Sequence, residues 1–193
     1  MAAIDGIETR KTFKQRLITT IIISLCLAIS IHLISSRYSI VFGHQQCLDG
    51  KVWLIEKNVL PQKGEYIYIK GTHIPRYEKV RLVKLVEGVE GDVVRVLPAA
   101  EGITGEVIIN NMPRKLKIRA YVQLVDTNGT VQKVYPVYKE GTNGSELPFL
   151  LGYGTTVIKN GYYVAGTHPA SYDSRYYGIV DKKDVLGRAI LIF

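Results

Sequence analysis

The sequence is poor in cysteine, with two in 193 residues, Cys26 and Cys47. Cys26 lies inside a long apolar run and cannot pair with Cys47 outside it without disrupting that run. A small fold held together by disulfides is therefore excluded, and Cys47 is expected to be a lone thiol. If the domain around it is exported, where thiols tend to be oxidised, Cys47 is also a candidate nucleophile.

Several common catalytic and binding motifs are absent. The sequence has no GxxxxGK[ST] phosphate loop, no HExxH motif and no CxxC pair. The histidines are isolated from one another, so neither a metal nor a cofactor is predicted; they are His32, His44, His73 and His168. Folding could bring His44 and His168 together, but an ordinary surface histidine is the simpler interpretation of each. Composition alone leaves a Cys/His or Ser/His hydrolase open.

The formal net charge is +8, but the cations are spread along the chain. No basic run with interleaved aromatic residues is present, so nucleic acid is not a predicted partner. The anionic headgroups of a lipid bilayer suit a basic domain near a membrane better. A solvated surface with no specific partner is the simplest interpretation.

Charged residues are missing from residues 17–35, a run of apolar sequence near the N-terminus. At 1.5 Å per residue this run roughly matches a ~30 Å hydrocarbon core, which predicts a transmembrane anchor. Cations precede the run and only Arg37 follows closely; the preceding cations are Arg10, Lys11, Lys14 and Arg16. This asymmetry predicts that residues 1–16 are cytoplasmic and that residues 36–193 form a domain on the far side.

A cleaved signal peptide is the alternative for this N-terminal segment. Its apolar region usually has only ~7–15 residues and ends in a small-x-small cleavage site. The run here is longer, and its exit, S-S-R-Y-S-I-V-F-G at 35–43, has no A-x-A. A retained anchor is therefore favoured.

The domain after the anchor is predicted to be mainly β. Alternating or β-branched runs separated by turn sequences predict strands, and helix signals are scarce. The runs are 51–57, 65–71, 79–88, 92–97, 105–111, 116–125, 130–138, 161–166 and 186–193. Many short strands without intervening helices favour folded antiparallel sheets or a partly closed barrel.

Two segments carry candidate chemistry. Lys84 lies on the apolar run 79–88, where it either reaches water along the surface or is truly buried. Periodicity alone favours the first, because lysine is rarely buried fully. If it is buried, its charged form is disfavoured, and a neutral amine is a general base. If 166–178 is extended, Asp173 and Arg175 would face one side and form an ion pair that fixes a loop. The alternative is a surface turn with aromatic packing.

The stretch S-Y-D-S-R-Y-Y-G-I-V at 171–180, followed by L-G-R-A at 186–189, resembles the C-terminal signature of type I signal peptidases. These are membrane proteases with a Ser/Lys dyad. K-L-V-E-G-V-E-G-D at 84–92 resembles the family's lysine box, with the same span from lysine to aspartate. P-Q-K-G-E-Y-I-Y-I-K at 61–70 and G-E-V-I-I-N-N at 105–111 resemble the strands before and after that box. The resemblance covers nearly the whole chain and implies a signal-peptidase-like fold.

The family has its nucleophilic serine just after the anchor, in an S-x-P context. Here C-L-D-G-K-V-W at 47–53 is similar to the S-L-P-x-G-x-Y pattern of the TraF-type subgroup, which serves conjugative transfer and pilus assembly. This alignment puts Cys47 at the nucleophile, Asp49 at the usual proline and Trp53 at the aromatic position. A thiol can replace the hydroxyl chemically, because it ionises more readily.

The resemblance implies roles for further residues. Lys84 corresponds to the general base, and Ser171 corresponds to the hydroxyl that orients it. Gln45, two positions before the nucleophile, occupies the place of an oxyanion-hole hydroxyl, and its longer amide can also donate a hydrogen bond. Asp173 and Arg175 are expected to support the site structurally.

The resemblance implies a single-pass protein of the bacterial inner membrane with a periplasmic catalytic domain. Its expected partners are the lipid bilayer, a membrane-inserted pilin-like precursor and the conjugation machinery. The precursor would be cleaved by hydrolysis, or cyclised onto its own N-terminal amine. Two alternatives remain. One is an inactive scaffold or pilin-binding subunit, favoured by the changes at Cys47, Asp49 and Gln45; the other is an ordinary signal peptidase for secreted proteins.

Overall fold

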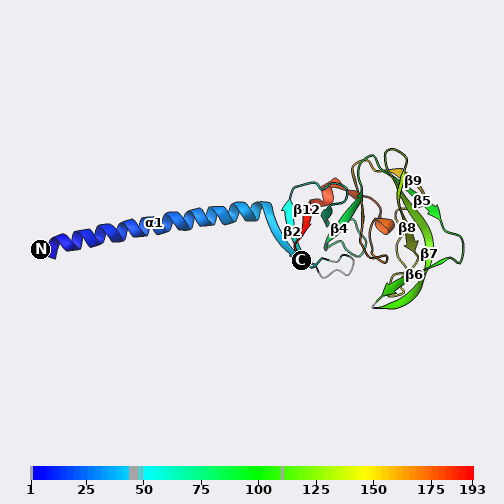
Figure 1. Ribbon diagram of the computed structural model, residues 1–193, viewed down its shortest axis with the longest axis horizontal. Coiled ribbons are helices and arrows are strands. Elements are labelled where there is room, and N and C mark those ends of the chain that lie inside the picture. The colour runs from blue at the N-terminus through cyan, green and yellow to red at the C-terminus, as the bar shows by residue number, and fades with distance from the viewer. Residues whose placement is uncertain (1, 44–47, 49, 110) are drawn as a thin grey trace. The chain divides into compact units, whose positions relative to one another are not determined.

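The structure is a computed structural model that describes residues 2–43, 48, 50–109 and 111–193, and the side chains from residue 13 onward. The chain divides into two compact units, Met1–Ser39 and Ile40–Phe193 (Figure 1). The first unit consists of a long helix and the first two residues of a strand, and the second carries the rest of both β-sheets and both short helices. Each unit is described below by itself.

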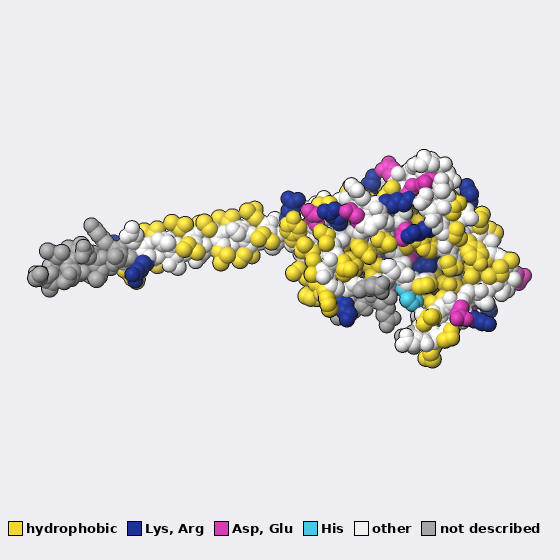
Figure 2. All heavy atoms as spheres, viewed as in Figure 1, with side chains coloured by type: hydrophobic (Ala, Val, Ile, Leu, Met, Phe, Trp, Pro, Cys, Tyr) yellow, Lys and Arg dark blue, Asp and Glu magenta, His cyan; other side chains and the backbone are white. Residues whose placement is uncertain are grey.

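The helix α1 (Ala2–Arg37) contains the expected anchor. Its 25-residue segment Phe13–Arg37 is long and apolar enough to cross a membrane. At 1.5 Å per residue this segment extends about 37 Å. Its side chains are exposed, and apolar ones cover most of its length (Figure 2). Because an exposed apolar helix is unfavourable in water, α1 is compatible with a membrane anchor that includes residues 17–35.

Several hydroxyl groups of this apolar segment are satisfied inside the helix. Three hydroxyl groups each donate a hydrogen bond to the carbonyl four residues earlier, at 2.8–3.0 Å; they belong to Thr19, Thr20 and Ser30. An unsatisfied hydroxyl is costly in a hydrocarbon environment, so these bonds suit a segment that enters a bilayer.

The larger sheet of the second unit has seven strands in the order β1-β2-β12-β3-β4-β10-β11. Its strands are β1 (Tyr38–Phe42), β2 (Val52–Lys57), β12 (Val185–Leu191), β3 (Tyr66–Lys70), β4 (Arg81–Gly88), β10 (Gly161–Ala165) and β11 (Val180–Asp181). From β2 to β11 all neighbours are antiparallel. The last strand of the chain, β12, lies between β2 and β3, so the two ends of the domain sequence meet in one sheet.

The smaller sheet has the order β6-β7-β5-β9, with β8 also paired to β7. Its strands are β6 (Thr104–Ile109), β7 (Met112–Val125), β5 (Val93–Pro98), β9 (Gly154–Val157) and β8 (Val131–Tyr138). The long strand β7 curves strongly (Figure 1). Its first half pairs with β6, and its second half pairs with β5 and β8.

Strand β10 lies between two apolar cores and contributes side chains to both. All five of its residues are buried. Tyr163 packs in the cluster of the smaller sheet with Val94, whereas Tyr162 and Val164 pack in the cluster of the larger sheet. This alternation follows from the two-residue period of a strand, and it explains why β10 is a continuous apolar run.

The prediction of a mainly β, antiparallel domain is confirmed, and every expected run overlaps a strand. The sequence reasoning missed β1, β9 and β11, and it missed α2 (Ser174–Tyr177) and the 3-10 helix η1 (Lys182–Asp184). These elements are short. The four exposed residues of β9, G-T-T-V, carry no apolar alternation that could have revealed them.

Candidate active site

Lys84 is buried in the larger sheet, with 2% of its surface exposed. Its strand β4 lies between β3 and β10, and Lys84 pairs with Ile67 across the first of these. The interpretation that Lys84 reaches water along the surface is therefore wrong. Alternation misled because β4 is covered on both faces: Leu82 and Val83, on opposite faces, are both buried.

In this interior the Lys84 side chain forms a hydrogen bond with a hydroxyl group. Lys84 Nζ lies 3.0 Å from Ser171 Oγ, and Ser171 is 1% exposed. The structure thus brings together two of the residues that the sequence placed in one site. Burial shields Nζ from water, and the serine hydroxyl is its hydrogen-bond partner.

The loop that carries Ser171 connects β10 to α2 and is tightened by its own backbone. The Ser171 N–H donates to the His168 carbonyl at 2.9 Å. On the other side, the Ser171 carbonyl accepts a hydrogen bond of 3.0 Å from Arg175 Nη2. Both backbone groups of Ser171 are therefore engaged, which leaves its hydroxyl to face Lys84.

Asp173 and Arg175 form the predicted ion pair, with Arg175 Nη2 2.7 Å from Asp173 Oδ2. A second bond, from Nε to Oδ1 at 2.7 Å, makes the pair bidentate. The expectation of an extended segment is wrong here, because Asp173 is the N-cap of α2 and Arg175 lies within that helical turn. As the N-cap, Asp173 accepts a hydrogen bond from the backbone N–H of Arg175, two positions further on. The same carboxylate therefore forms both the helix cap and the ion pair.

The same ion pair holds the ends of the Ser171 loop. The Gly166 N–H donates to Asp173 Oδ2 at 3.0 Å, and Arg175 Nη1 donates to the Pro169 carbonyl at 2.7 Å. Burial alone disfavours a charged guanidinium, but the Asp173 carboxylate beside it raises the pKa of Arg175 above its usual range. Arg175 is thus a fixed cation that holds the loop through hydrogen bonds to its backbone carbonyls.

An aromatic side chain that sequence reasoning missed covers Arg175. The Tyr135 ring lies 5.7 Å from the guanidinium carbon of Arg175. Burial, together with the negative charge of Glu87, to which the hydroxyl is hydrogen-bonded, raises the pKa of Tyr135. Glu87 in turn accepts a 2.6 Å bond from Lys133. No pattern in the sequence connects these residues, because β4 and β8 are distant in the chain.

His168 joins the Ser171 loop to the β6–β7 hairpin. The Ala170 N–H donates to His168 Nδ1 at 3.1 Å, so the proton lies on Nε2, which is 3.2 Å from the Ile108 carbonyl. The interpretation of His168 as an ordinary surface histidine is therefore too simple. His44 lies outside the described residues.

The turn after the lysine strand explains the rest of the lysine-box motif. Gly91 has a φ of 96°, in the region that favours glycine. The Asp92 carboxylate accepts the Val89 N–H at 3.1 Å and Lys63 Nζ at 2.9 Å. The glycine forms the turn, and the aspartate connects it to the turn before β3, so both fix the end of the strand that carries Lys84.

The two other predicted site residues, Cys47 and Gln45, lie outside the described residues. The described residues beside them are closely packed. Leu48 is buried in an apolar cluster that also contains Val83, the neighbour of Lys84. Gly50 has no room for a side chain, because a Cβ there would lie 2.3 Å from the Trp53 ring.

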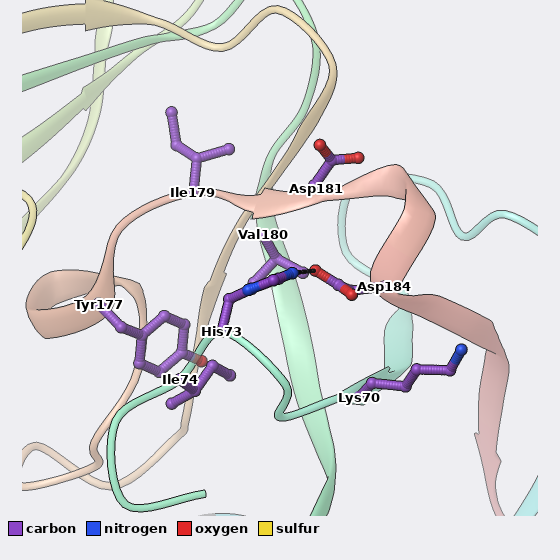
Figure 3. Close-up of a pocket in the computed structure, with 8 residues that line it drawn as sticks. All are labelled: Lys70, His73, Ile74, Tyr177, Ile179, Val180, Asp181 and Asp184. Carbon is purple, nitrogen blue, oxygen red and sulfur yellow. Dashed lines mark ion pairs between the residues drawn. The ribbon is translucent and has the colours of Figure 1, made fainter. Parts of the chain in front are cut away.

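A separate pocket of about 230 Å³ lies among β11, η1 and the loop after β3. In it His73 Nε2 points toward Asp184 Oδ2, 3.8 Å away (Figure 3). Lys70 and Asp181 also line it. It contains neither Lys84 nor Ser171, and we therefore place the candidate active site at the latter pair.

The family model of signal peptidase, peptidase S26, matches residues 13–193. The chain belongs to this family. The match includes the strand of Lys84 and the loop of Ser171, and it supports a signal-peptidase-type protease activity for this signal peptidase family member. No curated protein matches the chain.

Proposed function

We propose that this signal peptidase family member is a membrane-anchored endopeptidase that uses Cys47 as nucleophile and Lys84 as general base. The observation that carries the proposal is the buried hydrogen bond between Lys84 Nζ and Ser171 Oγ. A lysine held in the domain interior against a serine hydroxyl supports a role as general base, because its Nζ has a fixed position.

The described residues next to the two proposed reacting groups share one apolar cluster. Leu48 follows Cys47 in the chain, and Val83 precedes Lys84. Leu48 and Val83 belong to one cluster of buried side chains, with Trp53 and Tyr68. The covalent neighbours of both groups are thus held in the same part of the core.

In the proposed reaction the Cys47 thiol attacks the carbonyl carbon of the scissile peptide bond, and its proton passes to Lys84 Nζ. The C–N bond then breaks, the leaving amine takes that proton, and the acyl group remains as a thioester on Cys47. Water attacks the thioester to give a carboxylate and restores the thiol. If the precursor's own N-terminal amine attacks instead, the product is a cyclic amide.

Gln45 would donate its side-chain amide to the oxyanion of the tetrahedral intermediate. One such donor typically accelerates acyl transfer by about 10²–10³-fold. Ser171 would orient Lys84, and Arg175 with Asp173 would hold Ser171. These last three act through Lys84 and are positioning residues.

The proposed substrate is a pilin-like precursor inserted in the same membrane, processed for conjugative transfer. The segment C-L-D-G-K-V-W supports this, because its closest resemblance is to the subgroup that processes pilins. In this proposal the cations before the apolar run 17–35 keep the N-terminus in the cytoplasm, and the domain lies in the periplasm of a bacterium. A membrane-inserted substrate suits a tethered enzyme, because tethering raises their effective concentration.

The dyad can be tested without knowing the substrate. In the full chain with Cys26→Ala, Cys47 is the one remaining thiol. We expect iodoacetamide to alkylate it rapidly, and Lys84→Met to slow this reaction about tenfold, because only the thiolate reacts. Lys70→Met, which removes a lysine at the end of the neighbouring strand β3, is the matched control and leaves the rate unchanged. An equal rate with and without Lys84 would refute the dyad.

Function is tested by mass spectrometry of pilin from cells that carry the protein. Cys47→Ala and Lys84→Ala should each leave the precursor unprocessed, and Cys47→Ser should retain some cleavage. A cyclic product shows aminolysis of the thioester, and a linear product shows hydrolysis. Normal processing with both alanine variants would overturn the enzyme assignment and leave the inactive scaffold, which binds the precursor without cutting it.

A further inference from the structure

A second pocket, of about 240 Å³, lies on the outer side of the smaller sheet. It forms where the loop 99–103, between β5 and β6, crosses β7. Its lining includes three cations, Lys117, Arg119 and Lys139, and the side chain of Tyr153. Of the proteolytic-site residues that the structure describes, none lines this pocket.

The strand geometry brings the three cations together. Lys117 and Arg119 are two residues apart on β7 and therefore project from the same face. Lys139 is held beside them, because its N–H donates to the Lys117 carbonyl at 2.8 Å. The buried Leu116, Ile118 and Ala120 show that the opposite face of β7 is the core side. The cations thus converge on the outer face.

Arg119 is held in place before any ligand binds. Its Nη1 donates to the Leu147 carbonyl at 3.4 Å, its Nη2 to Glu146 Oε1 at 2.9 Å, and its guanidinium lies over the Phe149 ring. Only 18% of the Arg119 side chain is exposed. A cation fixed in this way needs little further ordering to bind an anion.

The lysines have no such partners. Within the described part of the chain neither the Lys117 nor the Lys139 ammonium has an ion pair or hydrogen bond, and both residues are exposed. One carboxylate, Glu101, lines the pocket, and Glu146 is paired with Arg119. The lining therefore keeps an excess of positive charge.

We propose that this pocket binds a phosphate group, either as free phosphate or as part of a phospholipid headgroup. Two mobile ammonium groups beside a fixed guanidinium suit an oxyanion with several acceptor oxygens. The cavity is several times the ~30 Å³ that one water occupies, so it admits phosphate with a substituent. For a membrane-anchored protein, anionic headgroups are the nearest abundant source of that group. The proposal is independent of the proteolytic dyad.

The test uses the full chain in a non-ionic detergent, with binding followed by calorimetry. The probes are inorganic phosphate, short-chain phosphatidylglycerol and zwitterionic short-chain phosphatidylcholine. The variant Lys117→Gln/Lys139→Gln should weaken binding about tenfold, because each exposed charge contributes modestly to binding a dianion. Lys79→Gln/Arg81→Gln removes the same charge from exposed residues at the start of β4 and is the matched control.

Saturable phosphate binding that is weakened by the pocket variant but not by the control supports the proposal. If phosphatidylglycerol also binds and phosphatidylcholine does not, the source is an anionic lipid headgroup. If phosphate binds and neither lipid does, the source is a free phosphate compound. Equal weakening by both variants would show only general charge attraction and overturn the proposal, as would absence of saturable binding by phosphate and phosphatidylglycerol.

Discussion

Lys84 and Ser171 are 87 residues apart in the chain, yet Lys84 Nζ lies 3.0 Å from Ser171 Oγ in the domain interior. Two different elements create this pair. The lysine comes from β4, in the middle of the larger sheet, and the serine comes from the loop that precedes α2. Arg175 fixes the loop side through the Ser171 carbonyl, so the geometry depends on the ion pair with Asp173.

Replacing Lys84 with methionine should abolish processing while leaving the fold intact. General base catalysis typically contributes about 10²–10⁴-fold, so we expect cleavage to fall at least about 100-fold. The free energy of unfolding should change by less than about 1 kcal/mol, because removing a buried amine offsets the hydrogen bond that Ser171 loses. Denaturant unfolding measured beside precursor cleavage checks both parts. A variant that loses stability and activity together would point to a structural lysine.

Replacing Ser171 with alanine should reduce cleavage through Lys84 more than it reduces the stability of the fold. We expect cleavage to fall about tenfold and its pH dependence to change, since Lys84 loses the hydrogen bond that orients it. Ser174→Ala is the matched control. Ser174 is also buried and accepts the Val164 N–H at 2.9 Å, so both variants should lose about 1 kcal/mol of stability. Only Ser171→Ala should alter the pH profile of cleavage; the same profile in both variants would exclude an orienting role.

The buried ion pair between Asp173 and Arg175 should contribute far more to the free energy of unfolding than a surface ion pair does. Arg175→Ala leaves the Asp173 carboxylate buried and unpaired, which typically costs about 3–5 kcal/mol. Lys183→Ala breaks an exposed pair with Asp181, 3.5 Å apart, and should cost less than about 1 kcal/mol. Urea unfolding of both variants measures the difference. The double variant Asp173→Ala/Arg175→Ala should lose less stability than the sum of the losses in the two single variants. Strictly additive losses would mean that the two residues are not coupled.

The sequence predicted much of the fold because alternation is a local property. Each of the expected strand runs overlaps a strand, and the apolar run at 17–35 lies within α1. The pairing of Asp173 with Arg175 was also predictable, because the two residues are near in the chain. Features that depend on residues near one another in the chain were therefore predicted correctly.

Long-range packing could not be predicted in the same way. The burial of Lys84 depends on covering both faces of β4, which its own alternation does not reveal. Tyr135 comes to cover Arg175 only because β8 pairs with β7 and faces the Ser171 loop, and no motif marks it. His168 was recognised as isolated in sequence, but its bridge from Ala170 to Ile108 exists only once the hairpin is folded.

The buried tyrosines should make the domain sensitive to alkaline pH. Tyr176 is 1% exposed, and burial raises its pKa to about 12. In the unfolded chain a tyrosine titrates near 10. Between pH 10 and 12 the unfolded state therefore binds fewer protons than the folded state, and the free energy of unfolding falls as pH rises, by up to about 1.4 kcal/mol per pH unit for this residue.

Tyr176→Phe should remove that part of the alkaline slope. Some slope should persist, because burial also raises the pKa of Tyr163, another fully buried tyrosine. Tyr153→Phe is the control, since 59% of Tyr153 is exposed and its replacement should leave the slope unchanged. Urea unfolding between pH 9 and 12 measures these slopes. If Tyr176→Phe kept the full slope, the loss of stability would have to come from other groups, and the burial of this hydroxyl would not limit the alkaline stability of the domain.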